Sequence, residues 1–140
     1  MTPNNCPQKE CILAIDDEEG FLGVLKAALD SQGFLVHTAS TPDVAIKLYE
    51  KFHQDINMVL LDYLLPEMSC DLVFENLQRL NPDVRVVLLT ACEESVADEM
   101  LKRGLQGYLQ KPFNLPDLAQ KIREAIDTPA PACSASRAGT

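Results

Sequence analysis

Hydrophobic residues in this chain gather in short runs of strand length. Four runs rich in branched side chains and a weaker fifth occur at residues 11–15 (CILAI), 34–39 (FLVHTA), 57–61 (NMVLL), 84–89 (VRVVLL) and 106–110 (QGYLQ). The first, third and fourth are apolar almost without alternation, which is typical of central parallel strands covered on both faces. His37 and Thr38 make the second run more polar, which predicts a strand at the edge of the sheet.

The segments that follow these runs carry apolar residues at helical spacing. They cover residues 21–29, 45–52, 73–80, 96–101 and 115–126. Residues that commonly begin or end helices stand at the breaks: Gly33, Thr41, Pro42, Asn81, Pro82, Gly104 and Asn114. The pattern therefore predicts five strand–helix units.

Strict alternation of strands and helices predicts an α/β fold with one parallel sheet between two layers of helices. We expect a flavodoxin-like (βα)5 three-layer sandwich with strand order 2-1-3-4-5. The folded domain is predicted to span residues 10–127, after a flexible N-terminus at residues 1–9. Residues 128–140 are small, polar and rich in Pro and Ala, which predicts a disordered tail or the start of a linker.

Composition narrows the classes of function. A chain of 140 residues with 46% hydrophobic content suits one domain with its own core. The formal net charge of −9 argues against direct binding of nucleic acid or anionic membrane. Five cysteines without a C-x2-C pair support neither a disulfide framework nor a zinc site, and a reducing cytoplasm fits them best. No apolar run reaches the roughly 18 residues of a membrane helix.

Distinctive polar residues follow the ends of the predicted strands. Asp16 and Asp17 follow the first strand, Asp62 the third, Thr90 the fourth and Lys111 the fifth. A doubly wound sheet binds ligands outside the carboxyl ends of its strands, so these side chains should meet if the first and third strands are neighbours. Three close carboxylates raise one another's pKa unless a cation shares the site, and an all-oxygen site favours Mg²⁺.

This set of residues suits phosphoryl transfer. Asp62 could attack an in-line phosphorus, with Mg²⁺ and Lys111 neutralising charge on the phosphoryl oxygens and Thr90 donating a hydrogen bond. The expected product is an aspartyl phosphate.

Four motifs, in order, carry a family resemblance: ILAIDDEEGF, VLLDYLLPEMS, VVLLTA and GYLQKPF. Together they resemble the receiver domain of bacterial two-component response regulators, including single-domain chemotaxis-type regulators. The resemblance implies that Asp62 takes a phosphoryl group from a phosphohistidine of a sensor histidine kinase or histidine phosphotransfer protein. It also implies that Asp17, Asp62 and the main-chain carbonyl of Leu64 ligate Mg²⁺, while Asp16 acts mostly through metal-bound water.

The same resemblance assigns the remaining roles. It implies that Thr90 and Tyr108 form a switch pair, that Lys111 binds phosphate, and that the Lys111–Pro112 bond is cis. The fourth helix, fifth strand and fifth helix would change arrangement and bind a downstream target protein or output domain. Residues 128–140 contain no DNA-binding or catalytic motif, so we expect the output to be a protein contact made by the domain itself.

The sequence departs from the family pattern at Cys70, Leu105 and Gly107. Cys70 stands where glycine is usual, and we expect it in a loop near the pocket. Leu64 and Cys92 occupy the positions that tune hydrolysis of the phosphoryl group, and neither positions a water well. We therefore hypothesise a long-lived phosphoryl state.

Other interpretations stay open. Asp16 and Asp17 could only cap a helix, Lys111 could be a solvated lysine, and Tyr108 could be an ordinary half-buried aromatic residue. The domain could also be a degenerate receiver that binds partners without phosphorylation. A phosphatase with an aspartate nucleophile is less favoured, because the chain is short and Asp62 follows the third strand.

Overall fold

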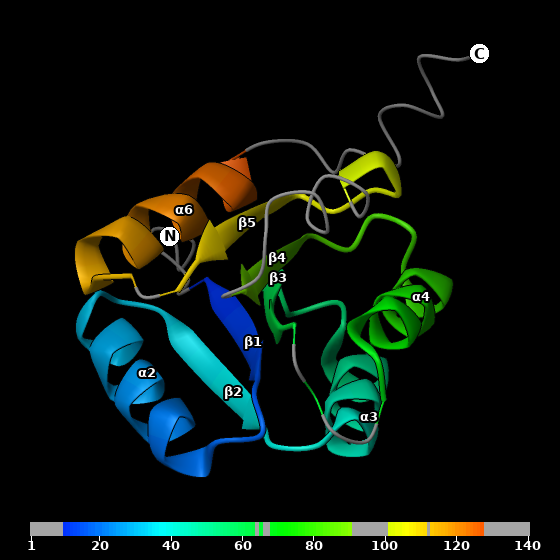
Figure 1. Ribbon diagram of the computed structural model, residues 1–140, viewed down its shortest axis with the longest axis horizontal. Helices are drawn as coiled ribbons and strands as arrows, with labels where there is room; N and C mark the ends of the chain where they lie inside the picture. Colours follow the sequence, from blue (N-terminus) through cyan, green and yellow to red (C-terminus); the bar gives the residue numbers. More distant parts are fainter. Residues whose placement is uncertain (1–9, 64, 66–67, 91–100, 112, 128–140) are drawn as a thin grey trace, which may run out of the picture.

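The structure, a computed structural model, describes residues 10–63, 65, 68–90, 101–111 and 113–127. Its elements are β1 (Cys11–Ile15), α2 (Glu19–Ser31), β2 (Leu35–Ala39), α3 (Pro42–Phe52), β3 (Met58–Asp62), α4 (Cys70–Leu80), β4 (Val86–Thr90), β5 (Gly107–Gln110) and α6 (Leu115–Asp127) (Figure 1). The predictions for residues 1–9 and 128–140, and most of the helix predicted over 96–101, lie outside the described residues.

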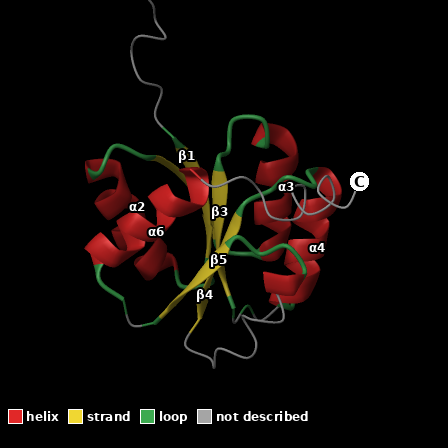
Figure 2. Ribbon diagram, turned by 90° about the horizontal axis from the view of Figure 1, so that it is seen from above, coloured by secondary structure: helices red, strands yellow, loops and turns green. Residues whose placement is uncertain are grey.

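The five strands form one parallel sheet in the order β2-β1-β3-β4-β5, which confirms the predicted topology. Helices α2 and α6 cover one face of the sheet, and α3 and α4 cover the other (Figure 2). We refer to these as the α2/α6 face and the α3/α4 face. The predicted three-layer α/β sandwich is therefore confirmed.

Each central strand sends alternate side chains into two separate cores, which explains why its sequence is apolar without a break. The core on the α2/α6 face takes Ile12, Ala14, Met58, Leu60, Val87 and Leu89 from the strands. The core on the α3/α4 face takes Leu13, Ile15, Val59, Leu61, Val86 and Leu88. A polar residue inside these runs would lie in one of the two cores, so charge can enter only at the strand ends.

Helix boundaries follow the local sequence. The side chain of Thr41 accepts a hydrogen bond from the Val44 N–H at 3.3 Å, and that of Asn114 accepts one from the Asp117 N–H at 2.8 Å. Gly33 has a φ of 95° at the end of α2, a conformation that favours glycine. The capping residue of α2 is Glu18, without a side-chain cap, so Asp16 and Asp17 are not the N-cap of that helix.

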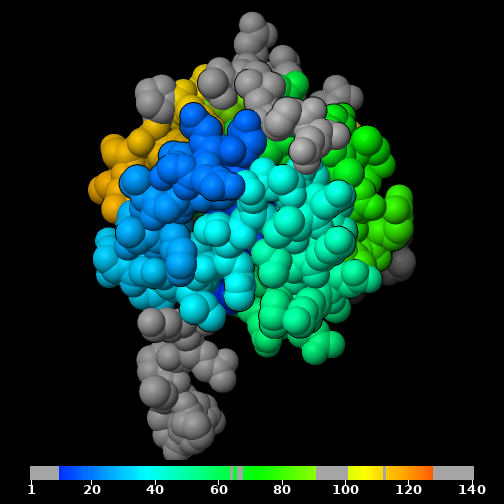
Figure 3. All heavy atoms as spheres, turned by 90° about the horizontal axis from the view of Figure 1, so that it is seen from below, coloured from blue at the N-terminus to red at the C-terminus, as the bar shows by residue number. Residues whose placement is uncertain are grey.

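Strand β2 lies at an edge of the sheet, as its polar residues predicted. Seen from below, β2 (cyan) lies at the surface between α2 (blue) and α3 (blue-green) (Figure 3). The ring of His37 stacks on Phe52 of α3, with centroids 5.3 Å apart. This contact gives the edge histidine a structural neighbour away from the strand ends that carry Asp16 and Asp62.

The expectation that Cys70 lies in a loop was wrong. Cys70 is the first residue of α4, after the N-cap Ser69, and it is buried in the core on the α3/α4 face. A small apolar thiol fits this packed position better than it fits water. Burial raises the pKa of the Cys70 thiol to about 12, and the nearby Asp71 acts in the same direction. The thiolate needed for redox chemistry is therefore scarce at neutral pH.

Two glycines of the α2 region should respond oppositely to alanine. A Cβ added at either position would contact no atom within 4 Å apart from its chain neighbours and the helix's own backbone. The backbone conformation at each glycine therefore decides how alanine changes the stability. Gly33→Ala should lower the free energy of unfolding by about 1 kcal/mol because of the positive φ. Gly23→Ala, in the exposed interior of α2, should raise it by about 0.5–1 kcal/mol. Urea unfolding measures both, and equal signs for the two variants would contradict this account of how α2 ends.

Candidate functional site

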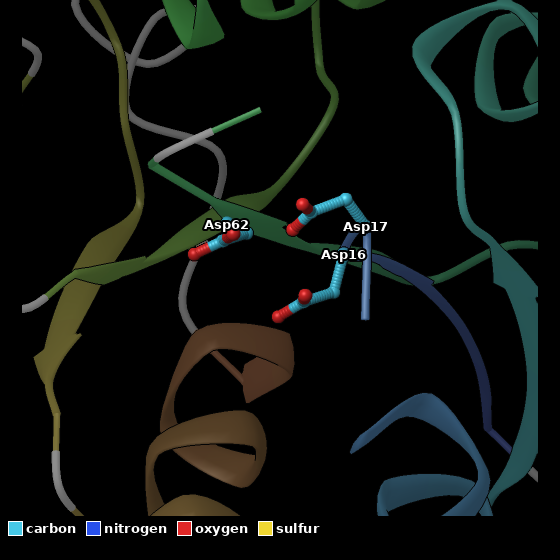
Figure 4. A group of neighbouring side chains, drawn as sticks. All are labelled: Asp16, Asp17 and Asp62. Atoms are coloured by element: carbon cyan, nitrogen blue, oxygen red, sulfur yellow. The ribbon is translucent and has the colours of Figure 1, made fainter. Parts of the chain in front are cut away.

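The topology brings polar residues of four strands to one edge of the sheet. Asp16 follows β1 directly, Asp62 ends β3, Thr90 ends β4, and Lys111 follows β5. Because β1 and β3 are neighbours, Asp16, Asp17 and Asp62 lie together and their carboxylates face a common space (Figure 4). One oxygen from each of the three carboxylates lies within 4.8 Å of the others.

Main-chain hydrogen bonds hold these residues in place. The Asp16 N–H donates to the Ala39 carbonyl at 3.1 Å, and the Lys111 N–H donates to the Thr90 carbonyl at 2.7 Å. The Oδ1 of Asp16 accepts a hydrogen bond from the Glu18 N–H at 2.9 Å. The sheet pairing thus continues past the strand ends and limits the movement of the site residues.

Lys111 is the cation of the site. Its Nζ donates a hydrogen bond to Oδ1 of Asp62 at 3.0 Å and lies 3.6 Å from Oδ2 of Asp16. Its side chain is only 30% exposed, so it is not the solvated lysine of the alternative interpretation. Burial alone would lower the pKa of Lys111, but the hydrogen bond and charge of Asp62, with a smaller effect of Asp16, raise it. Lys111 is therefore charged at neutral pH.

Asp62 is a buried carboxylate, and nearby positive charge compensates its negative charge only in part. It is 6% exposed, and burial is the main cause that raises its pKa. The charges of Asp16 and Asp17 act in the same direction, while the hydrogen bond and charge of Lys111 oppose them. The site thus holds more negative charge than Lys111 alone can balance.

A divalent cation fits the remaining acceptors. Oδ2 of Asp16 is buried and makes no hydrogen bond, with the Lys111 ammonium at 3.6 Å as its ion-pair partner. Asp17 is exposed and offers its carboxylate from the solvent side. Hard oxygen ligands with one side open to water are the set that Mg²⁺ prefers. Asp16, Asp17 and Asp62 could therefore hold this ion.

Alternation along the strands separates the acidic cluster from the predicted switch residues. Asp62 shares its parity with Met58 and Leu60, which face α2 and α6. Thr90 shares its parity with Val86 and Leu88, whose register partner is Tyr108. Tyr108 is half-buried and packs against the core on the α3/α4 face. Thr90 and Tyr108 are therefore aligned along the same face of the sheet.

Three sequence predictions fall on residues outside the described part of the chain. They are the Leu64 carbonyl as a metal ligand, the cis bond to Pro112 and the influence of Cys92 on hydrolysis. One contact near the site was not predicted. Phe21 was assigned only to the apolar spacing of a helix, yet its ring centroid lies 5.3 Å from Nζ of Lys111. An aromatic residue four positions after Asp17 was the available signal.

Comparison with known proteins identifies the family. Residues 12–123 match the family model of the response regulator receiver domain, and the chain belongs to this family. A solved receiver domain protein from Clostridium thermocellum is 28% identical, with a TM-score of 0.80 over 84% of this chain and 94% of that one. A CheY-like receiver domain protein from Methanospirillum hungatei is also 28% identical, with a TM-score of 0.76 over 86% of this chain and 95% of that one.

Curated relatives are longer proteins. The probable transcriptional regulator ycf27 of Porphyridium aerugineum is 32% identical over 85% of this chain and 49% of its own length. The regulatory protein AtoC of Escherichia coli is 33% identical over 82% of this chain and 25% of its own length. The chain thus spans about half or less of the length of these relatives. None of the helices in the described residues is long and apolar enough to cross a membrane.

Removing the charge of Asp62 should stabilise the metal-free protein. The folded state raises the pKa of Asp62, so protonation of this group favours folding. The stability that comes from protonating Asp62 is fully present below its ordinary pKa of 3.8. This stability is lost as the pH rises through the higher pKa that Asp62 has in the folded state. Urea unfolding in EDTA at pH 7 should give Asp62→Asn a free energy of unfolding about 1 kcal/mol above that of the unmodified protein.

The gain should shrink as the pH falls toward 3.8, because the carboxyl of the unmodified protein then becomes neutral as well. Asp55→Asn is the matched control, because Asp55 is exposed and outside the acidic cluster, and its effect should stay within about 0.5 kcal/mol. A lower stability of Asp62→Asn at neutral pH would show that the charge of Asp62 is fully compensated without metal.

Proposed function

We propose that this domain is a phosphoacceptor in two-component signal transduction and that Asp62 receives the phosphoryl group. The observation that carries the proposal is the hydrogen bond of 3.0 Å between Nζ of Lys111 and Oδ1 of Asp62, beside two further carboxylates within 4.8 Å. Lys111 binds one oxygen of Asp62, which leaves the other as the nucleophile. A structural ion pair would not need the additional buried carboxylate of Asp16.

Asp16, Asp17 and Asp62 are the residues that would hold Mg²⁺, which when bound neutralises charge on the phosphoryl oxygens. The protein's own residues orient the reaction. Lys111 is positioned to bind a phosphoryl oxygen with its ammonium group, and β3 fixes Asp62 at the end of the central sheet. Thr90, at the end of the neighbouring strand, would turn its hydroxyl toward the phosphoryl group and donate a hydrogen bond to it.

The donor in this proposal is a phosphohistidine on a sensor histidine kinase or a histidine phosphotransfer protein. A carboxylate oxygen of Asp62 forms a bond to phosphorus, and the bond between phosphorus and the imidazole nitrogen breaks. The imidazole leaves with the electron pair of that bond and takes up a proton if it was bound as the neutral form. The protein is thus a substrate that assists its own phosphorylation and slow dephosphorylation, and not an enzyme with turnover.

Phosphorylation would act on a partner through the α3/α4 side of β4 and β5. A phosphoryl group adds close to two negative charges and three acceptor oxygens at the strand ends. Thr90 would move toward these oxygens, and Tyr108 would turn into the space that it leaves. The shift would change the surface around β5 and α6, which a downstream target protein or output domain would bind. We place this function in the cytoplasm, without direct contacts to nucleic acid or membrane.

Incubation with acetyl phosphate tests the proposal. With Mg²⁺, intact mass spectrometry should show an adduct of about 80 Da, the mass added by one phosphoryl group. EDTA and Asp62→Asn should each abolish the adduct. Lys111→Ala should lower the rate of adduct formation by about tenfold or more, because the phosphoryl oxygens lose their protein cation.

Asp55→Asn serves as the control for a change of net charge, and its adduct should form at the unmodified rate. An adduct that persists in Asp62→Asn would assign the phosphoryl group to another residue. The absence of any adduct with both acetyl phosphate and phosphoramidate would favour a receiver that acts without phosphorylation. Release of phosphate over many cycles from p-nitrophenyl phosphate would instead favour a phosphatase.

A further inference from the structure

Phe21 lies beside the cation of the site. It stands in the first turn of α2, is half-buried, and packs against the core on the α2/α6 face. Its ring centroid is 5.3 Å from Nζ of Lys111, which is the geometry of a cation–π contact. The core accounts for an apolar residue at this position, but it does not account for a ring placed against an ammonium group.

A second ring supports the first. Phe113 follows Lys111 by two residues and packs edge-to-face on Phe21, with centroids 6.4 Å apart and planes at 68°. This pair connects the first turn of α2 to the segment between β5 and α6. The segment that carries Lys111 is therefore held against α2 as well as against the end of β4.

The contacts of Lys111 show how the ring of Phe21 could restrain its ammonium group. The ammonium group has three N–H donors on a flexible four-carbon chain. One donor binds Asp62 at 3.0 Å, and the carboxylate of Asp16 lies 3.6 Å away. The face of Phe21 occupies a further side of the same group. An aromatic face attracts the cation but offers no competing carboxylate, so it restrains Lys111 without drawing it away from Asp62.

We propose that Phe21 is a positioning residue for phosphoryl transfer, and that its aromatic face holds the ammonium group of Lys111 toward Asp62. This inference rests on the proposed role of Lys111 and adds a residue that acts through it. In this role, residue 21 must present an aromatic face to the ammonium group. Leucine fills much of the same space and keeps the contact with the core, but it has no such face.

Three variants separate this role from simple packing. Phe21→Leu removes the π face, and Phe21→Tyr restores it. Phe52→Leu is the matched control, because Phe52 is also half-buried and has the ammonium of Lys51 at 5.4 Å from its ring, away from the acidic cluster. Urea unfolding verifies that each variant is folded at the temperature used.

The rate of phosphorylation by phosphoramidate with Mg²⁺ is the first readout. Phe21→Leu should lower the second-order rate constant by about threefold, the size expected for one partly exposed cation–π contact. Phe21→Tyr should recover the unmodified rate, and Phe52→Leu should leave it unchanged. An unchanged rate in Phe21→Leu, or an equal loss in Phe21→Tyr or Phe52→Leu, would overturn the proposal.

The second readout does not depend on phosphorylation. In the NMR spectrum of the metal-free protein, the ε-methylene protons of Lys111 should be shifted upfield by the ring of Phe21. The shift should disappear in Phe21→Leu and persist in Phe21→Tyr. If the unmodified protein formed no adduct, the proposed function would fail. The NMR measurement would still show whether the ring of Phe21 contacts the ammonium group of Lys111. A Lys111 signal that is the same in Phe21→Leu as in the unmodified protein would overturn it.

Discussion

The ion pair between Lys111 and Asp62 is the interaction on which the site depends. A carboxylate that is only 6% exposed is costly without a cation, and Lys111 supplies one at 3.0 Å. Its single charge faces Asp16 and Asp17 as well, so compensation stays incomplete and the pKa of Asp62 remains raised by burial and by its acidic neighbours. In the proposed function, the same imbalance that costs stability without metal would favour binding of a divalent cation and leave one oxygen of Asp62 free to act as the nucleophile.

The packed sheet holds the acidic residues together at the ends of its strands. Strands β1 and β3 are apolar on both faces because helices cover each side, and their packing fixes the strand ends to which Asp16 and Asp62 belong. Main-chain hydrogen bonds extend this order to Lys111 through the Thr90 carbonyl. Packing of the core thus limits the movement of the site residues. The alternation of side chains places Thr90 and Tyr108 on the α3/α4 face, through which phosphorylation would act in the proposed function.

The strands, their order and the meeting of the acidic residues could be predicted from the sequence, because they follow from the spacing of apolar residues along the chain. Unbroken apolar runs predicted the central strands, and the polar run containing His37 predicted the edge. The convergence of Asp16 and Asp62 followed from the strand order. Contacts that depend on side-chain direction could not be predicted in this way. The start of α4 at Cys70 follows a local cap, Ser69, which the apolar spacing did not include. The ring of Phe21 beside Lys111 is set by packing between segments that are distant in sequence, which local patterns do not encode.

An NMR titration with Mg²⁺ tests the central claim most directly, namely that an excess of buried negative charge at the strand ends makes this edge of the sheet a cation site. We expect saturable shifts of the backbone amides that flank Asp16, Asp17 and Asp62, and we expect them to vanish in Asp17→Asn. Shifts of the same size in Asp17→Asn, or no saturable binding by the unmodified protein, would contradict the account.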